Sequence, residues 1–143
     1  MKELQVKLLS ENAIIPTRSH EQDGGLDMYS TQDRLISGRS SEEFDFGVAV
    51  DIPEGYVGLL FARSGLGSRG IRPSNCVGVI DSGYRGSIKV TLRNDTVSGK
   101  RIKVGDRVAQ LVIVPIVTPN PVVVDDFQEK TSRGEGGFGS SGR

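Results

Sequence analysis

The sequence predicts an all-β fold, a closed barrel or a jelly-roll-like sandwich, in a single domain. Apolar residues recur with period two or in short runs, helical periodicity is nearly absent, and glycine, proline and aspartate turn signals separate the runs. A chain of 143 residues can bury about 68–70% of the surface that its unfolded form exposes. The apolar pattern stops near Gln128, so we expect a body at residues 1–127 and a mobile arm at residues 128–143.

The first half of the chain contains three predicted strands. Residues 4–9 (LQVKLL) form the first, and Phe44–Ile52 alternates so that its five apolar residues share one face. Pro53–Gly55 predicts a turn, because proline presets φ and glycine tolerates positive φ. Tyr56–Ala62 is the returning strand. The best helix candidate is a single turn within Ser64–Gly70, which three glycines weaken.

The second half of the chain contains three more predicted strands. Ser87–Arg93 alternates, with Ile88, Val90 and Leu92 on one face. Arg107–Val117 and Pro121–Phe127 are apolar runs of strand length. The turn-rich stretch between the first two of these strands is predicted to be a connector.

Composition and charge exclude several classes of protein. The chain carries 18 basic and 18 acidic residues, so it has no electrostatic footprint for nucleic acid or an acidic membrane. Cys76 is the only cysteine, which excludes an internal disulfide and a multi-thiolate zinc site. A catalytic triad would depend on His20 alone, and no G-x-S-x-G elbow accompanies it.

The termini and the apolar segments give no sign of export or of membrane insertion. The first ten residues alternate and carry charge, unlike a leader peptide. The most apolar segment is too short to span a bilayer. We therefore expect an intracellular, cytoplasmic protein.

The segment Asp81–Gly86 (DSGYRG) precedes the strand Ser87–Arg93 and is predicted to be the tip of a β-hairpin. An aspartate at such a tip usually caps its own turn. Asp81 and Tyr84 also suit a pocket, since a carboxylate can orient and deprotonate a water while the ring packs on a sugar or a base. The local sequence leaves both interpretations open.

Arg63, Ser64 and Gly65 offer a charge, a hydroxyl and a backbone amide in succession, which suits phosphate oxygens. The alternative is an ordinary helix cap at Ser64. Gln110 is a polar residue in an apolar run and needs a partner, for which a structural group is the first expectation. Asp27 follows two glycines and suits a turn cap or an acid near a hydrated metal.

The tail contains the spacing G-x-G-x-x-G within Gly134–Gly139. A dinucleotide-binding turn of that pattern needs a preceding strand and a following helix, and neither is predicted here. The glycines still allow backbone amides to approach phosphates closely.

Five motifs occur in order along the chain: GGLDMYS, ARSGLGSRG, NCVGVIDSGYRG, GDRVAQLVI and RGEGGFGSSG. Together they resemble the five signature motifs of the homotrimeric dUTP pyrophosphatases (dUTPases), from Gly24 to Gly142. The departures are small: GGLDM replaces the usual alanine-glycine-tyrosine-aspartate-leucine, Ala62 replaces a proline, and Ser141 replaces a threonine. None of them removes an expected chemical group.

The resemblance implies a jelly-roll-like β-barrel of the β-clip type that assembles as a homotrimer. It implies Mg²⁺-dependent hydrolysis of dUTP to dUMP and pyrophosphate, which limits uracil in DNA and supplies dUMP for thymidylate synthesis. The catalytic positions would be Asp81, which activates the attacking water, and Ser64, which stabilises the leaving pyrophosphate. Mg²⁺ would be held by phosphates and water with no direct protein ligand, and Asp27 would be an outer-shell acid.

The resemblance also assigns the substrate-binding positions. They are Arg63, Ser64, Gly65, Asn75, Gly78, Val79, Ile80, Asp81, Tyr84, Lys89, Gln110, Arg133, Gly137, Phe138, Gly139, Ser140 and Ser141. The backbone of the hairpin would read uracil, and Tyr84 would leave no room for a 2′-hydroxyl. The tail would close over the site, with Arg133 on the terminal phosphate and Phe138 over the base, and would reach a neighbouring subunit.

Three alternatives remain beside this interpretation. A dCTP deaminase has the same fold but a different base-proximal acid and usually lacks the glycine-rich tail. A nucleotide-sensing regulator would use the fold to bind a partner protein, and a large inserted loop would favour it; none is seen between the fourth and fifth motifs. The last alternative is a purely structural module.

Overall fold

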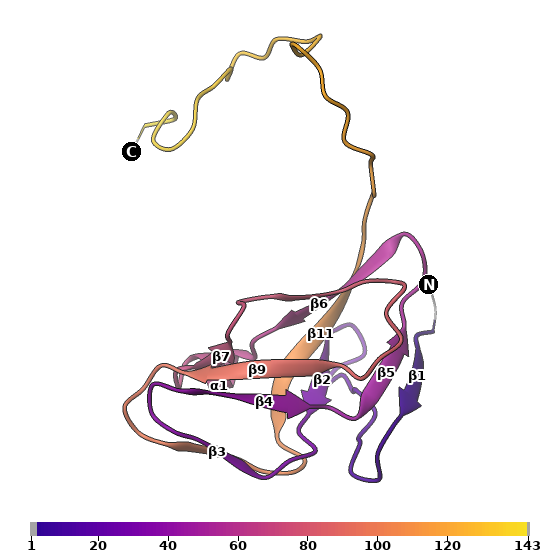
Figure 1. Cartoon of the computed structure of the whole chain (residues 1–143), viewed down its shortest axis with the longest axis vertical. Helices are drawn as coiled ribbons and strands as arrows, with labels where there is room; N and C mark the ends of the chain where they lie inside the picture. Colours follow the sequence, from indigo (N-terminus) through magenta and orange to yellow (C-terminus); the bar gives the residue numbers. More distant parts are fainter. Residues whose placement is uncertain (1–2, 143) are drawn as a thin grey trace.

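The computed structural model describes residues 3–142, so the ends of the predicted body and arm at residues 1, 2 and 143 lie outside it. Within that range the chain is a jelly-roll-like barrel of antiparallel strands with one four-residue helix (Figure 1). The strands are β1 (Gln5–Leu8), β2 (Gly25–Tyr29), β3 (Arg34–Ile36), β4 (Ser41–Asp45), β5 (Val48–Asp51), β6 (Tyr56–Phe61), β7 (Ile71–Pro73), β8 (Gly78–Ile80), β9 (Lys89–Asn94), β10 (Lys100–Ile102) and β11 (Arg107–Pro115), and the helix is α1 (Ser64–Gly67).

Strand pairing is mostly long-range. One sheet has the order β2-β11-β6-β8 and a second has the order β4-β9-β7, while β1 pairs with β5 and β3 with β10. The central strand of the first sheet, β11, connects strands from the beginning and the middle of the chain. This crossing of distant segments closes the barrel.

The segment Phe44–Ile52 is two strands rather than the single strand predicted. Gly47 has φ +64°, which breaks the segment between β4 and β5. The break lets the chain leave the partner of β4, which is β9, and pair with β1 instead. All five apolar residues of the segment are nonetheless buried, as the alternation predicted.

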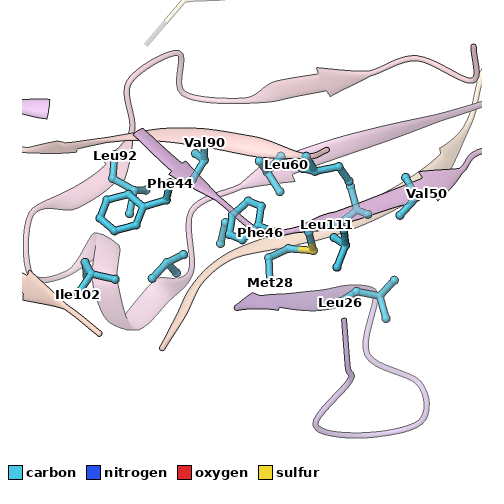
Figure 2. Close-up of a cluster of buried hydrophobic side chains, with 14 of the residues drawn as sticks. Leu26, Met28, Phe44, Phe46, Val50, Leu60, Val90, Leu92, Ile102 and Leu111 are labelled. Atoms are coloured by element: carbon cyan, nitrogen blue, oxygen red, sulfur yellow. The ribbon is translucent and has the colours of Figure 1, made fainter. Parts of the chain in front are cut away.

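The core fills the barrel between the sheets. Figure 2 shows Phe46 beside Met28 and Leu111, with Phe44 toward Leu92. Burying each such side chain contributes roughly 1.5–3 kcal/mol to folding. The apolar face predicted for Ser87–Arg93 is confirmed, since its three apolar residues all belong to this core.

The predicted β-hairpin around Asp81–Gly86 is wrong. β8 pairs with β6, and β9 pairs with β4 and β7, so the two strands that flank the segment belong to different sheets. Residues 81–88 therefore bridge the two sheets instead of closing a tight turn between paired strands.

The strand predicted at Pro121–Phe127 does not form. β11 ends at Pro115, and the chain then runs away from the barrel as an extended arm (Figure 1). The side chain of Val123 is 98% exposed, and Phe127 is exposed as well. Period and composition favour a strand here, but no strand of the barrel lies alongside to accept its backbone hydrogen bonds.

Candidate active site

A gap between β8 and β9 forms the first part of the site. β7 covers only the far end of β9, at Leu92–Asn94, so the edge of β9 near Lys89 faces the edge of β8 without pairing to it. A cavity of about 210 Å³ is lined by Val79, Ile80, Asp81, Tyr84, Ser87, Ile88 and Lys89. A second cavity of about 360 Å³ is lined by Glu43, Leu60, Ser74, Asn75, Gly78, Lys89, Val90 and Thr91. The gap thus presents strand-edge N–H and C=O groups to a ligand.

Tyr84 and Asp81 meet at the mouth of this gap, as the sequence predicted for a shared pocket. The backbone N–H of Tyr84 donates to the Asp81 carbonyl over 3.0 Å, and the Tyr84 hydroxyl donates to the Ser87 carbonyl over 2.8 Å. The ring folds over Gly86, where an added Cβ would lie 2.6 Å from the Tyr84 hydroxyl oxygen. Gly86 is therefore needed at its position, which sequence reasoning missed.

A recess of about 270 Å³ beside α1 forms the second part of the site. It is lined by Arg63, Gly65, Leu66, Arg69, Arg101, Ile102, Asp106, Arg107 and Val108. Arg63, Arg69 and Arg107 bring guanidinium groups to one place, which suits phosphate oxygens. The hydrogen bond and charge of Asp33 raise the pKa of Arg101 above its ordinary value, so this side chain stays charged.

Asp27 holds two of these arginines. Its carboxylate accepts from the Nε of Arg63 over 2.7 Å and from Arg107 over 3.4 Å, and the Asp27 side chain is only 13% exposed. The structure thus gives Asp27 a clear role, which is to orient Arg63. Its predicted place in the outer shell of a metal stays a prediction.

A β-bulge brings Arg107 to the same face as Gln110. The pairing of β11 with β2 shifts after Arg107, so that Arg107 lies opposite Tyr29 while Gln110 lies opposite Asp27. Two residues three positions apart therefore share a face, which strict alternation forbids. Arg107 was inside a quoted motif, but the period-two pattern gave no reason to select it.

Gln110 has the structural partner that was the first expectation. Its side-chain N–H donates to the Ala62 carbonyl over 2.9 Å, directly before Arg63. Its Oε1 lies over Gly25, where a Cβ would be 2.3 Å away, so that glycine makes room for the amide.

The alternative of a cap at Ser64 is wrong. The residue before the helix is Arg63, and Ser64 is the first helical residue. The Ser64 hydroxyl is therefore not committed to capping the backbone of this turn, and its predicted phosphate contact stays a prediction.

The tail residues lie away from both parts of the site in this conformation (Figure 1). Phe138 is fully exposed, and the Nε of Arg133 donates to the Gly136 carbonyl over 2.9 Å. Gly137, Gly139, Ser140 and Ser141 belong to a succession of local turns, such as the bond from Ser140 N–H to the Gly137 carbonyl at 3.1 Å. The structure does not bring these predicted binding residues to the gap of the same chain.

The donors of the site suit phosphates better than a bare metal ion. Among residues 3–142, no group of three or more histidine, cysteine, aspartate or glutamate residues could hold a metal. Four arginines and a single carboxylate, Asp106, line the recess beside α1, and Asp27 is already engaged with Arg63. Such residues fit a metal that is carried by the oxygens of a bound polyphosphate.

The chain presents an open pair of strand edges with a carboxylate at its mouth and, separately lined, an arginine-rich recess; the two suit the base and the phosphates of a nucleotide. A family model described as dUTPase matches residues 11–142. A deoxyuridine 5′-triphosphate nucleotidohydrolase of Mycolicibacterium gilvum is 44% identical over 145 residues, covering 97% of this chain and 94% of the relative. One from Arabidopsis thaliana is 42% identical, covering 96% and 82%.

Solved structures agree with these sequence matches. The dUTPase of Staphylococcus bacteriophage 80alpha with dUPNHPP superposes with a TM-score of 0.93, at 38% identity and with both chains fully covered. A D95N mutant dUTPase from phage phi11 of S. aureus, described with a structural Mg(II) ion, gives 0.84 at 35% identity, covering 89% and 99%. The chain belongs to the dUTPase family.

Proposed function

We propose that this chain hydrolyses dUTP to dUMP and pyrophosphate with Mg²⁺, with Asp81 activating the attacking water. Its membership of the dUTPase family supports this activity over the dCTP deaminase alternative. The observation that carries the assignment of residues is the unpaired gap between β8 and β9, with Asp81 and Tyr84 at its mouth. A hydrolase of this kind limits uracil incorporation into DNA and supplies dUMP for thymidylate synthesis.

Uracil binds in the gap between β8 and β9. The backbone groups of Gly78, Val79 and Ile80 on one side and of Lys89 on the other pair with its edge, and Asn75 lines the adjoining cavity. Cytosine presents the opposite donor and acceptor pattern and leaves backbone groups unpaired. Such mismatches discriminate on the order of 10⁴-fold. The narrow gap also excludes the methyl group of thymine.

Tyr84 selects the sugar. Its ring is oriented by the bond to the Ser87 carbonyl and lies over Gly86. A ring in this position leaves no room for a 2′-hydroxyl, and this steric form of specificity excludes ribonucleotides.

The phosphates bind in the recess beside α1. Arg63 and Gly65 line this recess and contact the phosphate oxygens, and Asp27 keeps Arg63 aimed at them. We propose the same contact for Ser64, which lies between them in the sequence, and for Gln110, whose amide bonds to the carbonyl before Arg63. The Asp81 carboxylate accepts a proton from the water that attacks the α-phosphorus, and the bond to the β-phosphate oxygen breaks as pyrophosphate leaves. The Ser64 hydroxyl and the Gly65 N–H stabilise the charge that develops on this leaving group. Mg²⁺, when bound, supplies positive charge to the phosphate oxygens.

Residues 128–143, the last part of the arm that begins after Pro115, close over the site. Arg133 contacts the terminal phosphate, and Gly137, Gly139, Ser140 and Ser141 surround the phosphate chain. Phe138 stacks on the uracil, a contact worth roughly 1–3 kcal/mol. Its full exposure leaves the ring free to stack on a base. Closure excludes water from the reaction.

The working unit is a homotrimer in which each site draws motifs from all three subunits and the arms reach neighbouring sites. The arm runs away from its own barrel, and its valines and Phe127 are exposed (Figure 1). Leu8, Leu9 and Ile15 on the barrel are exposed too, and apolar surface of this kind is usually covered by a partner. Sedimentation at working concentration tests this proposal, and an active monomer would contradict it.

We also propose a cytoplasmic location. Cys76 is exposed and unpaired with another cysteine among the described residues, which suits a reducing compartment. No helix within residues 3–142 has the length and apolar character needed to cross a bilayer. Fractionation of the source cells tests the location.

Pyrophosphate release from dUTP, UTP, dTTP and dCTP tests the activity. We expect dUTP alone to be a good substrate and Asp81→Asn to lose nearly all turnover, because an amide cannot take the proton from water. Asp81→Asn should still bind dUMP, which is the control for an intact site. Equal hydrolysis of UTP would contradict the role of Tyr84, and an unimpaired Asp81→Asn would contradict that of Asp81.

A further inference from the structure

The segment that carries Asp81 spans two sheets and is anchored firmly only at its ends. At one end β8 pairs with β6. At the other end Ile88 N–H donates to the Val48 carbonyl over 2.8 Å, and the Ser87 hydroxyl donates to the Asp45 carboxylate. Residues 81–85 between these anchors contribute nothing to the buried core.

Arg85 crosses the middle of this segment. One terminal nitrogen of its guanidinium donates to the carbonyls of Ser82 and of Tyr84, the latter over 3.2 Å. The other terminal nitrogen lies 2.6 Å from Oδ1 of Asp51. A planar guanidinium joins both groups at once, because its N–H donors have a fixed fork geometry.

Asp51 is a rigid place to attach the segment. It is the last residue of β5 and pairs with Gln5 of β1. The preceding residues Val48 and Val50 are buried in the core. The position of the Asp81 segment is thereby tied to the barrel.

The cavities separate Arg85 from the gap in which the base is proposed to bind. Tyr84 and Ser87 line the 210 Å³ cavity between β8 and β9. Asp51 and Arg85 line a different recess of about 450 Å³, together with Glu54. Asp81 is the one residue that lines both. Arg85 does not line the cavity proposed for the base, so it can act on Asp81 and Tyr84 through the backbone of the segment.

We propose that Arg85 and Asp51 are positioning residues for the hydrolysis, holding the Asp81 carboxylate and the Tyr84 ring in register with the substrate. This proposal rests on the proposed function of Asp81. The Arg85 and Asp51 side chains are 57% and 47% exposed, so their ion pair is screened by solvent and contributes little to global stability. A displacement of about 1 Å at the reacting groups can nevertheless cost on the order of 10²-fold in rate.

Four variants test the proposal: Arg85→Gln, Arg85→Lys, Asp51→Asn, and the double variant of Arg85→Gln with Asp51→Asn. We expect Arg85→Gln and Asp51→Asn each to lower kcat for dUTP by roughly 10- to 100-fold, with a smaller change in KM and an almost unchanged Tm. The double variant should be no worse than either single variant, since both break one interaction. Arg85→Lys should recover part of the loss, because it keeps the charge without the fork.

Glu54→Gln is the matched control. Glu54 is a carboxylate in the same recess, and its side chain makes no ion pair with Arg85 among the described residues. This variant should keep wild-type kcat. A fall in kcat as large as that of Asp51→Asn would show that any negative charge in the recess has this effect. It would overturn the specific role of the Asp51–Arg85 ion pair.

Other outcomes would also overturn the proposal. Additive losses in the double variant, or wild-type kcat in Asp51→Asn, would show that the two residues do not act together. A rise in KM with kcat retained would make Arg85 a substrate-binding residue.

Hydrogen exchange at the Tyr84 N–H, which bonds to the Asp81 carbonyl, gives a readout that needs no turnover. Exchange should be faster in both single variants, and unchanged exchange would contradict the proposal. A wild-type protein that releases no pyrophosphate would refute the proposed function instead, while this exchange measurement would still decide the positioning role.

Discussion

The barrel and the arm use apolar residues in opposite ways. In the barrel, Phe44 and Phe46 are almost completely buried among strands that are distant in sequence. In the arm, Val123 and Phe138 are exposed on an extended chain. The difference shows that an apolar run becomes a buried strand only where another strand lies alongside to pair with it. Under the proposed function, the apolar contacts of the arm lie outside its own chain, with nucleotide or another copy.

The largest effect on stability is expected from the barrel. Phe44→Ala should lower the free energy of unfolding by about 3–5 kcal/mol, because it removes a buried ring and leaves a cavity. Urea denaturation measures the change. Phe127→Ala in the arm is the matched control and should leave the monomer's unfolding unchanged. Equal losses for the two variants would break the distinction between the regions.

Truncation after Thr131 should leave stability unchanged and lower activity. The barrel should keep its Tm, because no residue beyond Thr131 contributes to the core. The value of kcat/KM should fall on the order of 10²-fold or more, since stacking alone accounts for roughly 1–3 kcal/mol. Phe138→Ala removes the ring and Phe138→Tyr keeps it, so comparing their kcat/KM with that of the truncated protein separates the contribution of the ring from that of the rest of the tail. Full turnover in the truncated protein would reduce the tail to a linker.

The smallest effect is expected at Asp95, on the surface of the barrel. A hydrogen bond from Arg72, supported by Arg93, lowers the pKa of Asp95 below its ordinary value of 3.8. The stabilisation is therefore present above pH 3.8 and is lost as pH falls through the lower pKa of the folded state.

Asp95→Asn tests this expectation. The variant should have a slightly lower Tm at pH 7, and thermal scans should show the difference from wild type vanishing in strong acid. A difference that stays constant with pH would contradict the ion-pair account.

The sequence predicted which faces are buried better than which strands pair. Alternation identified the buried side of Phe44–Ile52, because the period of a strand is local. It gave no sign of the break at Gly47 or of the separation of β8 from β9, because pairing depends on residues far along the chain. The connector predicted after Ser87–Arg93 likewise contains β10, whose partner β3 is distant in sequence.

The candidate site shows the same limit. Ordered motifs identified Asp81, Tyr84 and Arg63. The contacts that orient them join residues remote in sequence, as Asp27 with Arg63 and Asp51 with Arg85 do. Arg107 was missed because a β-bulge after it changes which face of β11 the preceding residues occupy. No local sequence pattern predicts that bulge.

The unpaired edges of β8 and β9 also affect how the protein can evolve. Base selection, as proposed, is made by backbone groups, which every residue type except proline carries alike. A point mutation can deform the gap but cannot exchange a backbone donor for an acceptor. The choice of base is therefore hard to change by single substitutions. The proposed choice of sugar depends instead on one side chain, the Tyr84 ring, and a single codon change is enough to lose it.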